Sequence, residues 1–326
     1  MSTAFLDGIA AKPFGIISSY PLKGGQLLGR LICFCFLFTS GAVAGHSQVP
    51  ESHDDPDQVR FVTSDVKRFW SALERSDSAS LASNLDSVYL QRGTSGLRDF
   101  IPNRIRSSNA LADAVRRRRA RYEEVRAFTE RIGEHEKGVR APLYALKYLF
   151  PEAVLPDIYF VIGRLSSGGT ATKSGVIVGT EMIRDSEQLR NLVAHEVIHY
   201  QQIVTGQLGA AEKAPSLLVM AVLEGSADFV AELISGVRGN LPAHEYGLPR
   251  EADLWKDFAS VMHGVDGEHW FSEDPPGERP LGLGYFLGYR IAEAFYARAP
   301  DKKAAIKELL TNRSFTDLLE KSGYDG

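Results

Sequence analysis

The chain has 326 residues, of which 44% are hydrophobic and 24% are charged, and its formal net charge is -4. These values are typical of a folded protein with a sizeable core in one or two domains. The weak negative charge gives no reason to expect nucleic acid or an anionic membrane surface as a partner.

The N-terminal segment has the features of an export signal. Lys23 and Arg30 precede a short apolar run, LICFCFLF, and small residues at positions 42–44 follow it. This pattern is typical of a secretory signal peptide, and the run is short for a transmembrane helix. We therefore predict an exported protein, periplasmic or extracellular, with no stable membrane insertion after cleavage. An uncleaved N-terminal anchor is the alternative. Both cysteines fall inside the apolar run, so the mature chain would contain no disulfide.

The chain divides by composition into successive regions. We predict a signal peptide over 1–44, a linker over 45–60, a helical N-terminal region over 61–155, a core of strands and motif-bearing helices over 156–236, and a C-terminal helical region over 237–326. Within the last region, residues 237–280 are expected to be irregular. The arginine run at 116–119 fits a solvated helix face better than a binding patch, because glutamates follow it.

Two β-rich runs mark the core. DIYFVIGRL and GVIVGTEMI are predicted strands, and the intervening SSGGTATKSG is a predicted turn and loop. Asp185 then caps a helix, which is expected to stop at Gly206. Pro215 begins another helix, which is expected to run to Gly236.

The stretch from His195 to Gln202, HEVIHYQQ, carries the strongest chemical signal in the chain. Two histidines four residues apart on a helix project from the same face. Both imidazoles can then reach one zinc ion at about 2.0–2.1 Å, and Glu196 can act as a general base on a metal-bound water. The pattern is short, so two solvated histidines on an amphipathic helix are the alternative.

The next helix offers a third ligand, which a catalytic zinc site needs besides two histidines and a water. Glu224 follows the apolar run LLVMAVL, where a carboxylate is costly to bury unless it is paired or binds a cation. Asp228 lies one turn later on the same face and can accept the second N–H of His195. Gly225 and Ala227 are small, so we expect the two helices to approach closely.

HEVIHYQQ followed by LEGSADF resembles the gluzincins, zinc peptidases in which two helix histidines and a glutamate from a later helix bind the metal. The resemblance implies that His195, His199 and Glu224 are the ligands and that Asp228 orients His195. FVIGRLSSGGTATKSGVIVGTEMI, LRDFIPNRI and GYFLGYRIAEAFY are also similar to segments of an exported bacterial family of predicted zinc-dependent proteases. This wider similarity runs from about residue 60 to the C-terminus.

Zinc peptidases place a hydrogen-bond donor where negative charge develops in the transition state. The sequence does not single out this donor. Our candidates, each with packing as its alternative role, are Tyr200, Tyr285, Tyr289 and Arg290. We expect His244, His263 and His269 at the surface or in loops.

In gluzincins an edge strand precedes the zinc helix and lies along the cleft. By analogy we assign this role to GVIVGTEMI, where a peptide would pair through backbone hydrogen bonds around Ile177 and Gly179. The Gly168-Gly169 pair before it would let a loop approach the ligand closely, and an ordinary hairpin turn is the alternative.

The expected fold is α+β: mainly helical, with a small antiparallel sheet packed by a two-helix zincin core. The expected protein is an exported Zn²⁺-dependent metallohydrolase, a peptidase that acts on peptide or protein substrates with Glu196 as general base. A non-catalytic, zinc-stabilised binding or assembly module of the cell envelope is the alternative. Glu196 argues against it, because a structural zinc site has no use for a base. The sequence indicates no oligomeric state.

Overall fold

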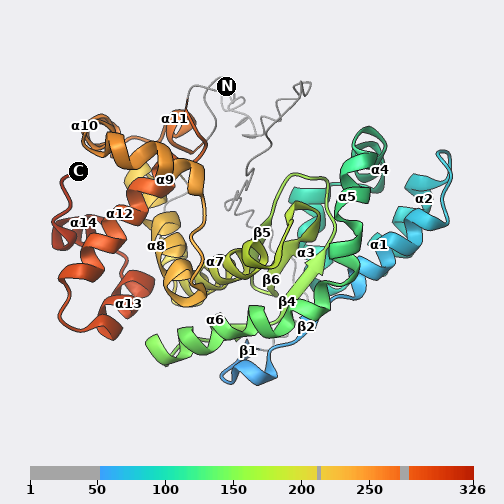
Figure 1. The fold of residues 1–326 in the computed structure, drawn as a ribbon, viewed down its shortest axis with the longest axis horizontal. Coiled ribbons are helices and arrows are strands. Elements are labelled where there is room, and N and C mark those ends of the chain that lie inside the picture. Colours follow the sequence, from blue (N-terminus) through green and yellow to red (C-terminus); the bar gives the residue numbers. More distant parts are fainter. Residues whose placement is uncertain (1–51, 211–213, 272–278) are drawn as a thin grey trace, which may run out of the picture. The chain divides into compact units, whose positions relative to one another are not determined.

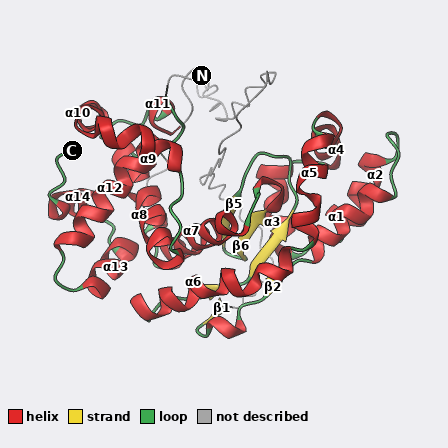
Figure 2. Ribbon diagram, viewed as in Figure 1, coloured by secondary structure: helices red, strands yellow, loops and turns green. Residues whose placement is uncertain are grey.

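The computed structural model describes residues 52–210, 214–271 and 279–326, all within the unit formed by residues 31–326 (Figure 1). The predicted signal peptide lies outside the described residues. Helices dominate the described chain, and strands are confined to two small sheets (Figure 2). The predicted α+β class is confirmed. None of the described helices is both long and apolar enough to cross a membrane.

The main sheet has four strands in the order β2-β4-β6-β5. The bounds are Phe61–Val62 for β2, Ile158–Val161 for β4, Gly169–Thr172 for β5 and Gly175–Gly179 for β6. β2 pairs with β4 in parallel, as does β4 with β6, and β5 alone is antiparallel to its neighbour. The sheet is therefore mixed, not antiparallel as predicted. A long helical connection returns the chain before β4. After β4 the chain enters the end strand β5 and turns tightly into β6, which thereby lies between β4 and β5 and parallel to β4.

β4 and β6 are buried along their whole length, in agreement with their continuous apolar sequences. Both were predicted as strands. Helix α7 (Ser186–Val204) packs against β5 and β6, whereas α1 (Ser64–Glu74) and α3 (Ser95–Phe100) pack against β4. A second, two-stranded sheet pairs β1 (Ser52–His53) with β3 (Leu155–Pro156).

Strand β5 occupies a segment that was predicted to be a loop. Its sequence, GTAT, has no apolar alternation, so the pattern of a half-buried strand is missing. It forms because a tight connection lets Thr172 pair with Gly175 and carries the pairing on to Gly169 and Val178. β5 lies at the end of the four-stranded sheet.

The helices before the sheet form the core that supports β4. The remaining ones are α2 (Leu81–Asn84), α4 (Ser108–Arg117), α5 (Arg119–Glu130) and α6 (Glu136–Leu149). The rings of Tyr89 and Tyr122 both pack against Phe69. Their hydroxyls bond to the backbone just after β4: Tyr89 to Ile162 and Tyr122 to the carbonyl of Gly163. These two tyrosines therefore fix the point where the chain leaves the sheet.

The described residues from 217 onward are mainly helical. Its helices are α8 (Leu217–Ser235), α9 (Leu241–Gly247), α10 (Glu251–Val261), α11 (Glu268–Phe271), α12 (Leu283–Arg298), α13 (Lys302–Thr311) and α14 (Phe315–Ser322). The prediction of an irregular segment over 237–280 was wrong for α9, α10 and α11. A proline in the first turn of α9 was taken as a loop signal, although that position tolerates proline. Helix α10 buries only Leu254 and Phe258, which leaves a weak apolar period.

Helices α8 and α12 touch backbone to backbone. A Cβ on Gly225 would lie 2.0 Å from the carbonyl carbon of Gly288, and a Cβ on Gly288 would lie 1.7 Å from the oxygen of Ala221. Only glycine fits at such a crossing. Gly225 thus makes room for α12, and not for α7 as predicted.

Candidate metal centre

Helix α7 carries the HEVIH motif into the protein interior. Asp185 caps its first turn by accepting hydrogen bonds from backbone N–H groups, and Gly206, with φ of 75°, follows its end. His195, Glu196 and His199 are all buried. The alternative of solvated histidines is therefore wrong.

His195, His199 and Glu224 converge on one point between α7 and α8, which lie side by side (Figure 1). The Nε2 atoms of the two histidines are 2.9 Å apart. Glu224 Oε2 lies 3.2 Å from Nε2 of His199 and 3.5 Å from Nε2 of His195. These three residues are a group that could hold a metal ion.

Each histidine is oriented by a partner at its other ring nitrogen. Asp228 Oδ1 lies 2.7 Å from His195 Nδ1. Gln202 Oε1 lies 2.7 Å from His199 Nδ1, and the Gln202 amide donates to the carbonyl of Leu223 on α8. Both partners can accept from a protonated Nδ1, so the Nε2 atom of each ring faces the centre, where it can ligate a metal once it is deprotonated. Sequence analysis grouped Asp228 with His195 but missed Gln202, whose signal was its place one turn after His199.

The centre favours a cation. Burial and the neighbouring His199 oppose a charged His195, but Asp228 and Glu224 outweigh them and raise the pKa of His195 to about 10. Burial likewise opposes ionisation of Glu224, yet the two imidazoles hold its pKa at about 2. Glu224 is therefore a carboxylate at neutral pH, although its side chain is fully buried.

The donor set fits zinc. Two imidazole nitrogens and a carboxylate oxygen that are 2.9–3.5 Å apart need a proton or a metal cation between them to offset their repulsion. Three ligands at about 2.0–2.1 Å in tetrahedral geometry would stand about 3.3 Å apart, close to the observed separations. Two histidines and one glutamate are also a known ligand set of catalytic zinc, which leaves a fourth position for water or substrate.

Glu196 packs against the edge strand β5. A Cβ on Gly169 would lie 2.7 Å from Glu196 Oε1 and 2.8 Å from its Cγ, so a larger side chain would displace the carboxylate. Gly169 is the first residue of β5, and β5 packs along α7. The carboxylate of Glu196 is therefore next to the end strand of the sheet as well as next to His195 in sequence.

The candidate oxyanion donors have other contacts. The Tyr289 hydroxyl donates to Glu232 and accepts from Arg238, about two turns along α8 from Glu224. The ring of Tyr285 lies 5.8 Å from that of Phe271. The described contacts of the Tyr289 hydroxyl therefore lie away from the three converging residues.

The other two candidates are Arg290 and Tyr200. Arg290 forms ion pairs with Glu251 and Glu293. Burial, together with the charge of Asp157 near the sheet, raises the pKa of Tyr200. The ion pairs of Arg290 thus join it to groups other than the converging residues.

Ile177 and Gly179 lie inside the sheet, contrary to the edge position assigned to their strand. Ile177 pairs with Tyr159 on one side and Thr170 on the other, and its side chain is fully buried. The end strand that packs against α7 is β5. The prediction failed because β5 was not recognised, which made β6 look like the last strand before α7.

His244 was expected at the surface and is instead buried in α9. Its ring lies 4.6 Å from that of Tyr289 and 5.3 Å from that of Phe286. Burial and the charge of Arg238 lower the pKa of His244 to about 4, so it is neutral at physiological pH. His263 and His269 are exposed, as expected.

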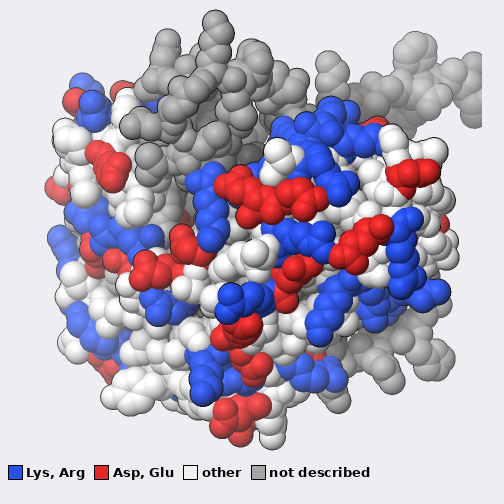
Figure 3. All heavy atoms as spheres, turned by 45° about the vertical axis from the view of Figure 1, so that its right-hand side comes forward, with Lys and Arg blue, Asp and Glu red and all other residues white. Residues whose placement is uncertain are grey.

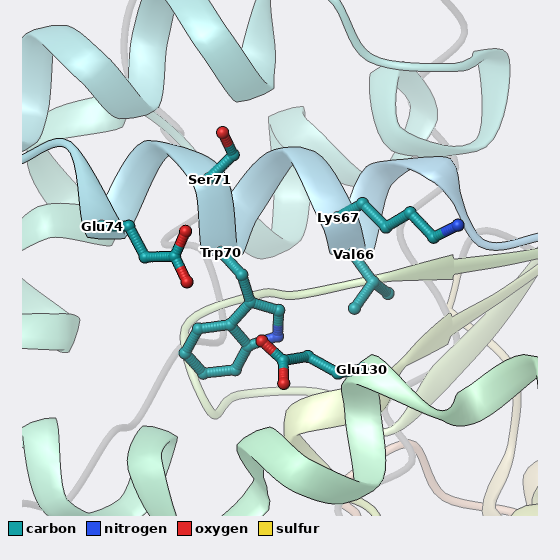
Figure 4. Close-up of a pocket in the computed structure, with 6 residues that line it drawn as sticks. All are labelled: Val66, Lys67, Trp70, Ser71, Glu74 and Glu130. Atoms are coloured by element: carbon teal, nitrogen blue, oxygen red, sulfur yellow. The ribbon is translucent and has the colours of Figure 1, made fainter.

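A hollow of about 270 Å³ lies between α1 and α5, away from the converging histidines (Figure 4). Its lining residues are Val66, Lys67, Trp70, Ser71, Glu74 and Glu130. All of them belong to α1 or α5, so the hollow is not part of the candidate metal centre.

Comparison with known proteins identifies a family. Residues 60–262 match the model of a family, DUF5700, described as a "putative zinc dependent peptidase". The matched range includes β2, the whole sheet and both helices of the metal centre. No curated protein and no solved structure gives a significant match to the chain. The zinc cofactor predicted from the sequence agrees with the family description and with the buried donor set.

Proposed function

The chain belongs to the DUF5700 family, and from this premise we propose that it is a gluzincin-type peptidase whose zinc ion is held by His195, His199 and Glu224. The observation that carries the proposal is the convergence of two oriented imidazoles and one ionised, buried carboxylate within 3.5 Å. A solvated helix face would supply neither the orientation nor the burial. Asp228 and Gln202 keep the Nε2 lone pairs of the two histidines directed at the centre.

When bound, zinc supplies a Lewis acid that polarises the scissile carbonyl and lowers the pKa of a water molecule. Glu196 accepts the proton of the attacking water and then donates it to the leaving amine. Its burial against Gly169 suits this role, because a carboxylate confined between α7 and β5 has few other positions. The sheet on one side and α8 on the other limit access of bulk water.

The substrate would bind as an additional strand next to β5. The end strand of a sheet offers backbone N–H and C=O groups to an extended peptide. β5 begins at Gly169 beside Glu196 and runs away from it to Thr172. A peptide that pairs with β5 would therefore carry one of its peptide bonds past the carboxylate that acts as base.

Export is a separate part of the proposal. Residues 1–44 would direct the chain across a membrane and would then be removed, on the evidence of their sequence alone. Mass spectrometry of the protein recovered from the envelope or medium tests this. A mature N-terminus at Gly45 is expected, and a full-length chain that stays with the cytosolic fraction would contradict export.

The central experiment is Glu196→Gln. The variant should keep about one zinc per chain, because Glu196 is not a ligand, and should lose about 10²- to 10⁴-fold in peptide hydrolysis. Hydrolysis is measured on a mixed peptide library with and without a chelator. Unchanged hydrolysis by Glu196→Gln would contradict the role of the base. Absence of any chelator-sensitive cleavage by the wild-type protein would favour the non-catalytic module.

A further inference from the structure

Three arginines gather beside the loop that leads from β4 to β5. Arg164 lies on this loop, partly buried, and its Nε donates to the backbone carbonyl of Arg104 over 2.9 Å. Burial lowers the pKa of Arg164, and the charges of Arg106 and Arg117 lower it further. Arg106 and Arg117 therefore each lie within electrostatic reach of Arg164, and we call these three residues the arginine cluster.

The arginine cluster has no acidic partner among the described residues. Neighbouring arginines of α4 and α5 differ in this respect, because they form ion pairs: Arg116 with Asp113, Arg119 with Glu123 and Arg121 with Glu124. Glu181 lies behind the same loop, but its carboxylate accepts from the backbone of Gly163 and Leu165. Figure 3 brings the α4–α5 side forward and shows basic side chains gathered on it. Like charges at a partly buried position are unfavourable, and an anion would relieve the repulsion.

The backbone holds the arginine cluster in place. The Arg104 carbonyl accepts from Arg164 Nε and also from the Ser166 hydroxyl, so the loop is tied to the end of the π-helical segment Ile101–Ile105. Arg106 follows this segment with φ of 72°, a conformation that non-glycine residues rarely adopt. Strained backbone of this kind persists where the surrounding structure fixes it, often at binding sites.

The arginine cluster lies upstream of the strand that carries Gly169. The loop after Arg164 is pinned where Gly179 N–H bonds to the carbonyl of Gly168 and where the Ser167 hydroxyl bonds to the carbonyl of Gly169. The five residues from Arg164 to Gly169 span at most about 17 Å. A peptide antiparallel to β5 would pass Glu196 and then continue toward this loop with its carboxyl-side residues.

We propose that Arg106, Arg117 and Arg164 form a subsite for an acidic side chain that lies on the carboxyl side of the bond to be cleaved. The inference rests on the proposed peptidase function and on pairing of the substrate with β5. Arginine suits the task because its planar guanidinium binds carboxylates in a bidentate manner and stays charged. The subsite would make the enzyme selective for acidic polypeptides.

The test uses two arms, so that failure of the subsite can be separated from failure of the peptidase proposal. In the first arm, wild-type protein cleaves paired peptides that differ by Asp or its isostere Asn at each position. In the second, zinc-loaded Glu196→Gln binds the same fluorescein-labelled peptides, measured by anisotropy. We expect about a tenfold to hundredfold preference for Asp at one or two positions after the cleaved bond, weakened by salt.

The double variant Arg106→Gln/Arg117→Gln should lose the preference in both arms. Both side chains are exposed, so the fold should persist, and Arg164 keeps its bond to Arg104. The matched control is Arg116→Gln/Arg119→Gln, which removes the same charge from nearby ion-paired positions on α4 and α5 and should keep the preference.

Cleavage with no difference between Asp and Asn peptides would overturn the subsite and leave the peptidase proposal intact. An equal loss of preference in the control variant would also overturn it, because the effect would then be one of net charge. A single-stranded oligonucleotide that competes as well as the acidic peptide would likewise overturn the subsite. Absence of cleavage of every peptide would instead contradict the peptidase function.

Discussion

Two buried glutamates, one at the metal centre and one beneath the loop before β5, have opposite electrostatics. Burial raises the pKa of both. For Glu224, between α7 and α8, the imidazoles of His199 and His195 outweigh burial and hold the pKa at about 2. For Glu181, beneath the loop before β5, backbone N–H groups compensate only in part and its pKa is raised to about 7.

The difference shows how the two sides of the site are built. The metal side relies on charge, because ionised Glu224 faces two imidazoles and the carboxyl group of Asp228 contacts one of them. The sheet side relies on backbone contacts: Glu181 holds the loop through Gly163 and Leu165, and Gly169 lies against Glu196. Substitutions on the two sides should therefore fail in different ways.

The largest expected effect is that of Glu181 on the pH dependence of the free energy of unfolding. Its pKa is about 7 in the folded protein against the usual 4.5, so the folded state binds the extra proton between these pH values. The free energy of unfolding should then fall by about 1.4 kcal/mol per pH unit over this range, about 3 kcal/mol in all, as pH rises. Glu181→Gln removes the titrating group and should remove this slope, as measured by urea unfolding from pH 5 to pH 8.

Exposed Glu245 provides the control for that experiment, because Glu245→Gln makes the same chemical change where burial is absent. This variant should keep the wild-type slope. If Glu181→Gln and wild-type protein show parallel stability profiles across the whole range, the raised pKa of Glu181 is wrong.

Gly169→Ala should act on catalysis while the metal stays bound. The added Cβ would lie 2.7 Å from Glu196 Oε1, so the carboxylate must move, and a displacement of about 1 Å can cost about 10²-fold in rate. Zinc content should not change, because the three ligands are on α7 and α8. Gly138→Ala on α6 is the control, since nothing lies within 4 Å of its Cβ position. Wild-type kcat in Gly169→Ala would show that β5 does not position the base.

The smallest effects are expected on zinc affinity, when the two residues that orient the histidines are substituted. Asp228→Ala should weaken zinc binding about 10- to 100-fold, because a charged acceptor at His195 Nδ1 is lost. Gln202→Ala should weaken zinc binding about 10-fold or less, because Gln202 is neutral. Competition with a chelating dye measures both affinities, with Glu232→Gln one turn beyond Asp228 as control. Equal losses at Asp228 and Gln202 would show that charge does not distinguish the two supports.

More of the metal side than of the sheet side could be predicted from the sequence. His195, His199, Glu224 and Asp228 follow from helical periodicity, because residues four apart share a face whatever else the chain does. Gln202 could have been found by the same rule. Two helices with such faces must pack together to bury them.

The sheet side could not be predicted in the same way. β5 is a polar GTAT segment whose strand state depends on β6 beside it, so no local pattern marks it. Tyr289 illustrates the same limit. The sequence made its hydroxyl a candidate donor to the transition state, but in the fold this hydroxyl is hydrogen-bonded to Glu232 and Arg238. The pairing of Gly225 with Gly288 that sets the crossing of α8 and α12 joins residues far apart in the chain.

The most direct test of the central claim is the zinc content of the purified protein and of Glu224→Ala, measured by native mass spectrometry after identical zinc loading and dialysis. Wild-type protein should carry about one zinc per chain, and Glu224→Ala should lose it while its circular dichroism spectrum stays helical. A Glu224→Ala protein that retains about one zinc with wild-type affinity would contradict the three-ligand centre.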